Sequence, residues 1–255
     1  LLAIAEESNF TYADVDALGY IEEKDYTQYH INKVLDLKLV NLQAVKSSKI
    51  KVVVDAVNSV GGTIIPQLLR AMGITDIIEL NCQPTGKFAH NPEPIPANLT
   101  QISATMKEHK ADIGIVVDPD VDRVALICEG GSMFVEEYTL VSVADYVLSK
   151  TPGNTVSNLS SSRALRDVTN RYDGCSYSAS AVGEVNVVTE MKRTNAIIGG
   201  EGNGGVIYPE LHYGRDALVG VALFLSLYVE RGLTMTELKR TYPAYYISKN
   251  RIDLQ

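Results

Sequence analysis

Short runs of apolar, largely β-branched residues alternate with amphipathic segments from residue 49 to near the end of the chain. A run of about four to eight apolar residues bounded by turn residues is typical of a buried strand, whereas apolar positions three and four residues apart are typical of a helix. In the first half of the chain, this pattern predicts strands at 50–54, 74–80, 112–117 and 124–128 and helices at 63–72 and 98–110.

The second half of the chain repeats the alternation. It predicts strands at 155–159, 175–179, 196–198 and 206–208, and helices at 136–150, 162–172, 184–193, 216–231 and 236–240. Strands and helices that alternate with short connections build parallel sheets with helices on both faces. We therefore predict an α/β fold of two tandem domains with mixed, largely parallel sheets sandwiched by helices.

The first 45 residues are more polar and have only a weak helical pattern at 13–21 and 30–45, where we expect lead-in helices. The opening residues lack Met and a basic segment, so we expect no signal peptide, and we expect the sequence to come from the middle of a longer chain. The apolar stretch 217–229 is shorter than the roughly 20 residues that span a membrane. We expect a buried helix there and no membrane association.

Composition narrows the class of protein. The 255 residues are 45% hydrophobic and 21% charged, which is ordinary for a globular protein. A net charge of −8 makes a nucleic-acid partner unexpected, because such partners need a basic surface. The three cysteines are far apart and lack the spacing of a zinc site, so we expect free thiols and a cytoplasmic protein.

Three carboxylates at alternate positions directly follow the predicted strand at 112–117: Asp118, Asp120 and Asp122. In an extended loop, this spacing lets all three converge on one point, where their mutual repulsion favours a bound cation. Oxygen ligands of this kind suit Mg²⁺. Arg123 follows at once, and its planar guanidinium suits a phosphate group. An acidic surface turn with Arg123 as a salt-bridge partner is the alternative interpretation.

Two other motifs share part of this pattern. An EF-hand has Asp at positions 1, 3 and 5 and Glu at position 12, where Glu129 falls, but it needs Gly where Arg123 stands. A haloacid-dehalogenase-type phosphatase also places Asp-x-Asp after an apolar strand and would use Asp118 as the nucleophile. Its pattern has Thr or Val at the fifth position, where this sequence has Asp122.

The segment 199–205 holds five glycines around Glu201 and Asn203. Glycine lets a ligand approach the backbone closely, and a carboxylate beside an amide suits neighbouring sugar hydroxyls. A flexible turn of a hairpin is the alternative.

Further candidates for substrate binding stand at strand-to-helix junctions or shortly after the glycines. A helix N-terminus at such a junction favours an anion such as phosphate. These candidates are Arg163, Gly183, His212 and Arg215.

Taken together, these segments resemble the α-D-phosphohexomutase family, which includes phosphoglucomutase, phosphomannomutase and phosphoglucosamine mutase. The resemblance lies in residues 52–62, 90–94, 118–123 and 200–205, which follow the family order along nearly the whole chain. Members have four domains. The resemblance implies the following assignment: the end of the first domain at 1–40, the second domain with the metal loop at 41–140, the third domain with the sugar-binding loop at 141–245, and the link to the fourth domain at 246–255.

The family's catalytic serine lies in a first-domain loop of the type Ser-His-Asn-Pro, which this sequence does not contain. Residues 89–92 read Ala-His-Asn-Pro, but their place after the second strand and the following Glu93-Pro94 fit the proline motif of the second domain. The phosphate-binding loop of the fourth domain is also missing. We therefore expect this chain to be inactive alone, with the first and fourth domains of the same protein as its partners.

The resemblance implies an isomerase for the whole protein. A phosphoserine donates its phosphoryl group to a hexose phosphate, and the resulting hexose 1,6-bisphosphate reorients and returns its other phosphate. By resemblance, the residues with roles are Asp118, Asp120 and Asp122 as Mg²⁺ ligands, Arg123 as a catalytic clamp on the phosphoryl group, and Glu201 and Asn203 as ligands of sugar hydroxyls.

The choice among glucose, mannose and glucosamine stays open. Many members have Ser where Asn203 stands, and some have His where Gly205 stands. Two other classes of function also stay open: a phosphatase that uses Asp118, and a sugar-phosphate-binding protein without catalysis.

Overall fold

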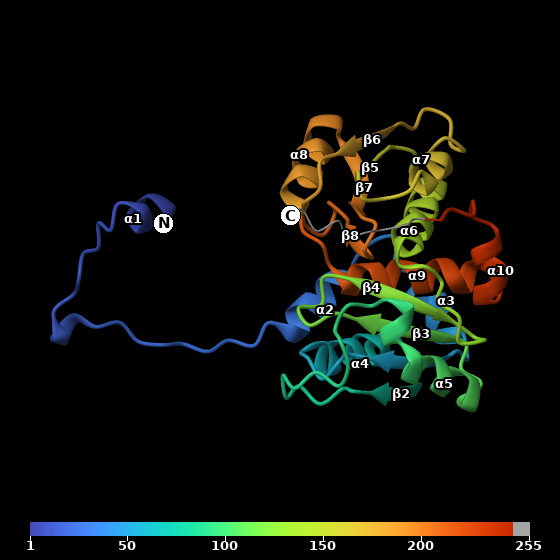
Figure 1. Cartoon of the computed structure of the whole chain (residues 1–255), viewed down its shortest axis with the longest axis horizontal. Helices are drawn as coiled ribbons and strands as arrows, with labels where there is room; N and C mark the ends of the chain where they lie inside the picture. Colours follow the sequence, from blue (N-terminus) through green and yellow to red (C-terminus); the bar gives the residue numbers. More distant parts are fainter. Residues whose placement is uncertain (247–255) are drawn as a thin grey trace, which may run out of the picture.

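The computed structural model describes residues 1–246. Two four-stranded sheets lie one above the other, each flanked by helices (Figure 1). The first sheet has the order β2-β1-β3-β4, in which β1 pairs in parallel with β2 and β3 while β4 is antiparallel to β3. Its strands are β1 (Lys51–Asp55), β2 (Asp76–Leu80), β3 (Ile113–Val117) and β4 (Val124–Cys128).

The central strands of this sheet are buried on both faces, which is why they appear as continuous apolar runs. On β1, Val52 and Val54 belong to the core that includes α4 (Gly61–Ala71). Val53 faces the other way, into the core that includes α5 (Thr100–His109). A short 3₁₀-helix, η2 (Pro96–Asn98), leads into α5.

The second sheet has the order β6-β5-β7-β8, again with parallel pairing except for the last strand. Its strands are β5 (Asn154–Asn158), β6 (Tyr177–Ser180), β7 (Ala196–Glu201) and β8 (Gly205–Ile207). One face packs on α8 (Glu184–Thr194), and the other faces α6 (Glu136–Lys150) and α7 (Ala164–Thr169).

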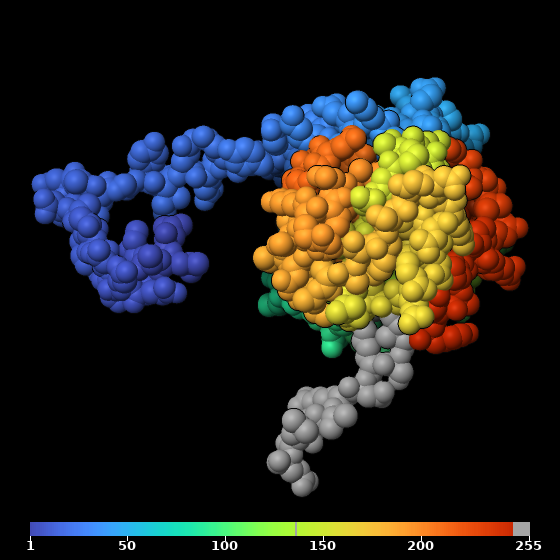
Figure 2. Space-filling model, turned by 90° about the horizontal axis from the view of Figure 1, so that it is seen from above, coloured from blue at the N-terminus to red at the C-terminus, as the bar shows by residue number. Residues whose placement is uncertain are grey.

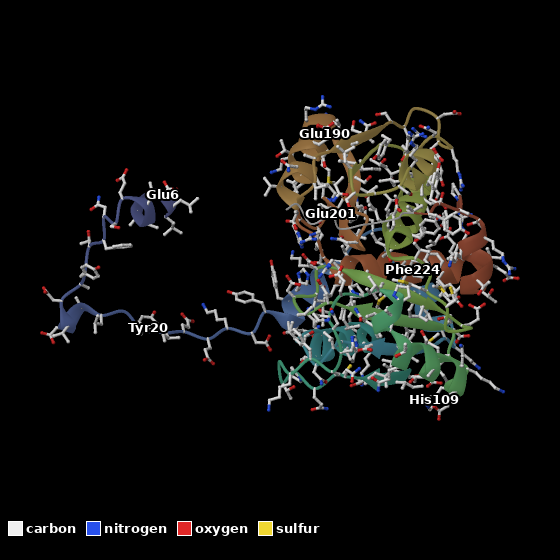
Figure 3. All side chains as sticks on the ribbon, in the orientation of Figure 1. Glu6, Tyr20, His109, Glu190, Glu201 and Phe224 are labelled. Atoms are coloured by element: carbon white, nitrogen blue, oxygen red, sulfur yellow. The ribbon has the colours of Figure 1, made fainter. Side chains whose placement is uncertain are left out.

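Helix α9 (Ala217–Arg231) lies between the two sheets and joins their cores. Its residues 217–227 are all buried, and it contacts β4, β8 and α6. Figure 3 shows Phe224 of α9 in this central position. The buried helix expected from the apolar stretch is thus confirmed. Among the residues described, no helix is both long and apolar enough to cross a membrane.

The N-terminal expectations were partly wrong. Residues 1–26 run away from the body of the molecule with every residue exposed (Figures 1 and 2). They contain only α1 (Leu2–Glu6) and the 3₁₀-helix η1 (Val15–Ala17). A helix over 13–21 does not form, because short helices owe their stability to packing and this segment packs on nothing among residues 1–246.

The single helix expected over 30–45 is also wrong. The structure has α2 (Thr27–Leu35) and α3 (Leu42–Ser47) instead. The break falls before Asn41, whose side chain accepts a hydrogen bond from the Ala44 N–H and so begins a new helix.

The α/β fold class and the strand-helix order are confirmed, with small shifts in bounds. The helix expected over 162–172 is shorter, and the Ser162 hydroxyl accepts a hydrogen bond from the N–H of Ala164, where α7 begins. Strand β7 extends through Glu201, so the first glycines of the expected loop lie in a strand. A last helix, α10 (Met235–Arg240), begins at a capping box of Thr234 and Glu237. Of the expected linker 246–255, only residue 246 is described; 247–255 lie outside the described residues.

Candidate functional site

The acidic loop begins where the buried strand β3 ends. The three carboxylates of Asp118, Asp120 and Asp122 each offer an oxygen, and these atoms lie within 4.8 Å of one another. The loop is a tight turn instead of the extended segment that we expected. Val121 adopts a left-handed backbone with φ of 61°, and its N–H donates to the Asp118 carbonyl at 3.2 Å. The turn lets the three side chains converge.

Asp118 is held firmly within this turn. Its Oδ1 accepts hydrogen bonds from the backbone N–H groups of Asp122 at 3.2 Å and Arg123 at 3.0 Å. Its Oδ2 accepts from Arg123 Nε at 2.6 Å. The far end of the Arg123 guanidinium reaches Glu93, at 3.4 Å. Asp118 is 1% exposed, so these contacts compensate a nearly buried charge.

Burial and the neighbouring negative charges perturb the ionisation of Asp122. Burial, followed by the charge of Asp118, raises the pKa of Asp122 to about 7, against the opposing charge of Arg215. A carboxylate that is hard to ionise beside two others favours a divalent cation. The donor set consists only of hard oxygens from one turn, and Asp120 is exposed enough to be reached from solvent. The residues present therefore fit Mg²⁺.

Glu201 occupies the end of β7, next to the turn that leads to β8. It is 5% exposed, and its Oε1 accepts from Asn158 Nδ2 at 2.7 Å. Asn203 lies in the turn, where its Oδ1 accepts from the Gly205 N–H at 3.2 Å and its Nδ2 lies 3.5 Å from Glu201 Oε2. The carboxylate and the amide that we expected to bind a sugar are thus neighbours.

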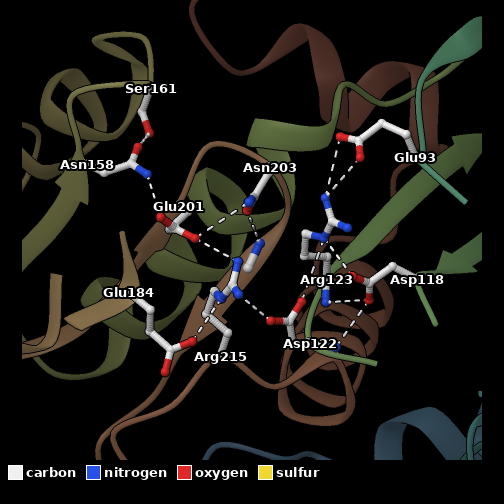
Figure 4. Close-up of polar contacts among 11 residues, drawn as sticks. Glu93, Asp118, Asp122, Arg123, Asn158, Ser161, Glu184, Glu201, Asn203 and Arg215 are labelled. Carbon is white, nitrogen blue, oxygen red and sulfur yellow. Dashed lines mark hydrogen bonds and ion pairs between the residues drawn. The ribbon is translucent and has the colours of Figure 1, made fainter. Parts of the chain in front are cut away.

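A single guanidinium joins the two loops (Figure 4). Arg215 donates to Glu201 Oε2 from Nη1 at 2.7 Å and to Glu184 Oε2 from Nε at 2.9 Å. Its Nη2 forms a short ion pair with Asp122 of the acidic loop. The backbone joins the same loops, because the Val124 N–H donates to the Gly204 carbonyl at 3.1 Å.

Three further candidates from the sequence lie at or shortly before the starts of helices α7, α8 and α9. Gly183 is the N-cap of α8, with φ of 112°, and precedes Glu184. Arg163 is exposed at the N-cap of α7. A hydrogen bond from Tyr245 lowers the pKa of Asp167, and the charges of Arg166 and Arg163 add to this effect. His212 lies with Asp216, its Nε2 3.0 Å from the Asp216 carboxylate.

Sequence reasoning missed two acidic partners of the site. Glu184 has no role in the prediction from the sequence, although its place at the start of a predicted helix beside Gly183 was a signal for it. Glu93 was seen only as part of a proline motif. Both pair with arginines that come from distant parts of the chain, Arg215 and Arg123.

Models of known families match almost all of the described chain. Residues 25–131 match the phosphoglucomutase/phosphomannomutase α/β/α domain II, and residues 136–245 match domain III of the same family. The chain belongs to the phosphoglucomutase/phosphomannomutase family. The resemblance inferred from the sequence is thus confirmed.

Individual relatives agree with this assignment. A phosphoglucomutase/phosphomannomutase of Thermococcus kodakarensis is 32% identical over 255 residues, which cover 98% of this chain and 55% of that protein. A probable phosphoglucosamine mutase of Methanococcoides burtonii is 35% identical over 242 residues, covering 94% of this chain and 53% of that protein. The chain therefore spans about half the length of these curated relatives.

A solved structure shows the same fold. The crystal structure of a phosphoglucomutase/phosphomannomutase family protein from Burkholderia thailandensis matches with a TM-score of 0.81 at 26% identity, over 95% of this chain and 51% of that one. The two stacked sheets are thus the family's arrangement of domains II and III.

Proposed function

We propose that this chain is the metal-binding and sugar-binding part of a phosphohexomutase, an isomerase that interconverts hexose 1-phosphate and hexose 6-phosphate through a phosphoserine and a hexose 1,6-bisphosphate. The observation that supports this most is the Arg215 bridge between the acidic loop and Glu201. It joins the proposed cation ligands to the proposed sugar ligands, as transfer of a phosphoryl group to a sugar requires.

On this proposal, Asp118, Asp120 and Asp122 hold Mg²⁺. When bound, the ion would neutralise negative charge on the phosphoryl group. Arg123 contributes a second positive charge, oriented by its bonds to Asp118 and Glu93. A guanidinium fixed in this way needs little rearrangement to stabilise charge that develops during transfer.

Glu201 and Asn203 are the proposed ligands of the sugar. Glu201 Oε1 accepts one hydrogen bond, from Asn158, and Oε2 accepts two, from Arg215 and from Asn203, which fixes the carboxylate in orientation. A carboxylate oxygen has two lone pairs, so Oε1 still accepts a sugar hydroxyl, and Asn203 offers both a donor and an acceptor. Arg163, Gly183, His212 and Arg215 stay predicted contacts of the substrate.

The domain limits also stay a proposal: 41–140 for the metal-binding domain and 141–245 for the sugar-binding domain, with residues 1–40 and 246–255 belonging to neighbouring parts. We propose that the first and fourth domains of the whole cytoplasmic protein supply the serine and a phosphate-binding loop. The chain alone is then expected to bind ligands without turnover.

The test is a calorimetric titration of the chain with Mg²⁺ at pH 7.5. Asp120→Asn is expected to weaken Mg²⁺ binding at least about tenfold, because it removes a charged ligand from the exposed side of the trio. Asp76→Asn is the matched control, since Asp76 is a mostly exposed carboxylate on β2 that pairs with Lys51. Unchanged Mg²⁺ affinity in Asp120→Asn would contradict the assignment of the ligands.

A second measurement tests the sugar site and the reaction. Binding of glucose 1,6-bisphosphate in the presence of Mg²⁺ is expected to weaken in Glu201→Gln. The whole protein is expected to interconvert hexose 1- and 6-phosphates, and this chain is not. Turnover by the chain alone would contradict the proposal that other domains supply the serine and the phosphate-binding loop. Absence of turnover by the whole protein would contradict the proposed mutase function.

The phosphatase alternative is disfavoured by the surroundings of Asp118. An attacking carboxylate oxygen must reach the phosphorus of the substrate, but Asp118 is 1% exposed; a cation held among the three carboxylates does not require Asp118 to touch the substrate. Phosphate release by this chain that is lost in Asp118→Asn would restore that alternative. A sugar-phosphate-binding protein without catalysis predicts binding but no turnover by the whole protein.

A further inference from the structure

A second group of metal-ligating side chains lies where α2 meets the start of α9. His30 of α2, His212 of the segment before α9, and Asp216 at the N-cap of α9 each offer one ligand atom, and these atoms lie within 4.8 Å of one another. Nε2 of His30 is 2.6 Å from Asp216 Oδ2, and Nε2 of His212 is 3.0 Å from the same oxygen. His30 and Asp216 are 186 positions apart, so tertiary structure creates the cluster.

The Asp216 carboxylate is fixed in orientation. Its other oxygen, Oδ1, accepts hydrogen bonds from the backbone N–H groups of Leu218 at 2.7 Å and Val219 at 3.2 Å. The side chain is 7% exposed. One oxygen is therefore held by the helix while the other is presented to two imidazole nitrogens. Metal sites use such outer hydrogen bonds to orient their ligands.

The cluster is open to solvent on one side. A hollow of about 270 Å³ is lined by the three residues, by Asp120 of the acidic loop and Arg215, and by apolar side chains that include Val60 and Ile64. The His30 side chain is 31% exposed and that of His212 is 43% exposed. A cation has a path to the cluster, and water has room to complete its coordination.

The donor chemistry differs from that of the acidic loop. Two imidazole nitrogens with one carboxylate suit Zn²⁺, with a water in the fourth position, whereas Mg²⁺ prefers oxygen alone. Ligand distances of about 2.0–2.1 Å in a tetrahedron place the donor atoms about 3.3 Å apart. The present spacings of 2.6 and 3.0 Å need only a small outward movement of the half-buried His30 and the exposed His212.

We propose that His30, His212 and Asp216 form a site for Zn²⁺, distinct from the Mg²⁺ site proposed at the acidic loop. The ion ties α2 to the start of α9. Asp216 directly follows Arg215, so an ion at this site stiffens the segment that carries the bridging guanidinium. The site does not depend on the proposed mutase reaction.

The experiment is a titration of the chelator-treated chain with Zn²⁺ while millimolar Mg²⁺ is present to occupy the acidic loop. One Zn²⁺ per chain is expected to bind, with a rise in melting temperature. Co²⁺ in place of Zn²⁺ is expected to give the visible absorption of a four-coordinate ion. His30→Gln and His212→Gln are each expected to weaken Zn²⁺ binding at least about 100-fold.

The control is His109→Gln, which removes an exposed histidine at the end of α5 (Figure 3) and is expected to leave Zn²⁺ affinity unchanged. Far-UV circular dichroism checks that the histidine variants fold. No Zn²⁺ binding up to millimolar concentration would overturn the proposal. Binding that survives both His30→Gln and His212→Gln but is lost in Asp120→Asn would also overturn it, because the ion would then lie in the acidic loop.

Discussion

Replacing Arg215 with methionine removes the cation shared by the two loops while keeping much of the aliphatic stem. Asp122, Glu184 and Glu201 then lose their common partner. The Arg215 side chain is 20% exposed and that of Glu201 is 7% exposed, so this pair is nearly buried. Glu184, at 36%, is more open to solvent.

The magnitude follows from these exposures. Removing one partner of a fully buried ion pair costs about 3–5 kcal/mol, because the other charge stays buried and unpaired. Pairs that are open to solvent contribute about 0–1 kcal/mol. Since Glu201 is close to the first case and Glu184 closer to the second, we expect the free energy of unfolding to fall by about 2–4 kcal/mol.

The assay is urea denaturation followed by far-UV circular dichroism at pH 7 without divalent cations. Arg215→Met with Glu201→Gln removes the stranded charge and is expected to recover at least about 1 kcal/mol of the loss. Arg193→Met, which breaks an exposed pair with Glu190, is the control and is expected to change nothing measurable. A loss below about 1 kcal/mol in Arg215→Met would show that the bridge does not hold the loops together.

Three further outcomes are expected. Gly204 has φ of +93°, and a Cβ there would lie 2.4 Å from the Val124 carbonyl oxygen. Gly204→Ala should therefore lower the free energy of unfolding by about 1–3 kcal/mol through backbone strain, and further through the clash. Gly174→Ala, with φ of +75° and open space around the Cβ, measures the backbone strain alone, and an equal loss of unfolding free energy in the two variants would contradict the close approach. Ser226→Ala should lower the free energy of unfolding by about 1–2 kcal/mol in urea denaturation, because it leaves the Asn41 N–H without the Ser226 oxygen that accepts its hydrogen bond at 2.9 Å. Ser47→Ala, at an exposed position, is the control, and equal urea midpoints of the two variants would refute the reasoning. Burial, followed by the charges of Glu79 and Asp55, raises the pKa of the Cys82 thiol to about 12, so its thiolate fraction at pH 8 is about 10³-fold lower than in an unfolded chain. Iodoacetamide labelling of Cys82, measured by mass spectrometry, should be slower in the native state by about that factor. Similar labelling rates with and without urea would contradict this prediction.

Local features of the sequence predicted the fold and the convergence of the three aspartates, although the loop is a tight turn instead of the expected extended segment. The strands of the first sheet are buried on both faces, so their apolar runs are continuous and easily recognised. The three aspartates lie within five positions of one another, and a single turn brings their carboxylates together. Neither prediction needed knowledge of distant contacts.

The contacts that complete the site were beyond the sequence because they join distant segments. Glu184 and Arg215 are 31 positions apart, and Arg123 and Glu93 are 30 apart. The tertiary packing within each half of the chain determines which of many charged side chains meet. The failure over residues 13–21 has a related cause, since a weak helical pattern forms a helix only where another surface covers its apolar side.

The link between β4 and β8 limits how the two loops move relative to each other. The Val124 N–H donates to the Gly204 carbonyl, and α9 packs against both strands, so backbone and core contacts hold the acidic loop and the Glu201 turn to each other. A ligand that spans both loops has one anchoring point on each of them. To present its opposite end to the acidic loop, the ligand itself would have to release one anchoring point and rotate.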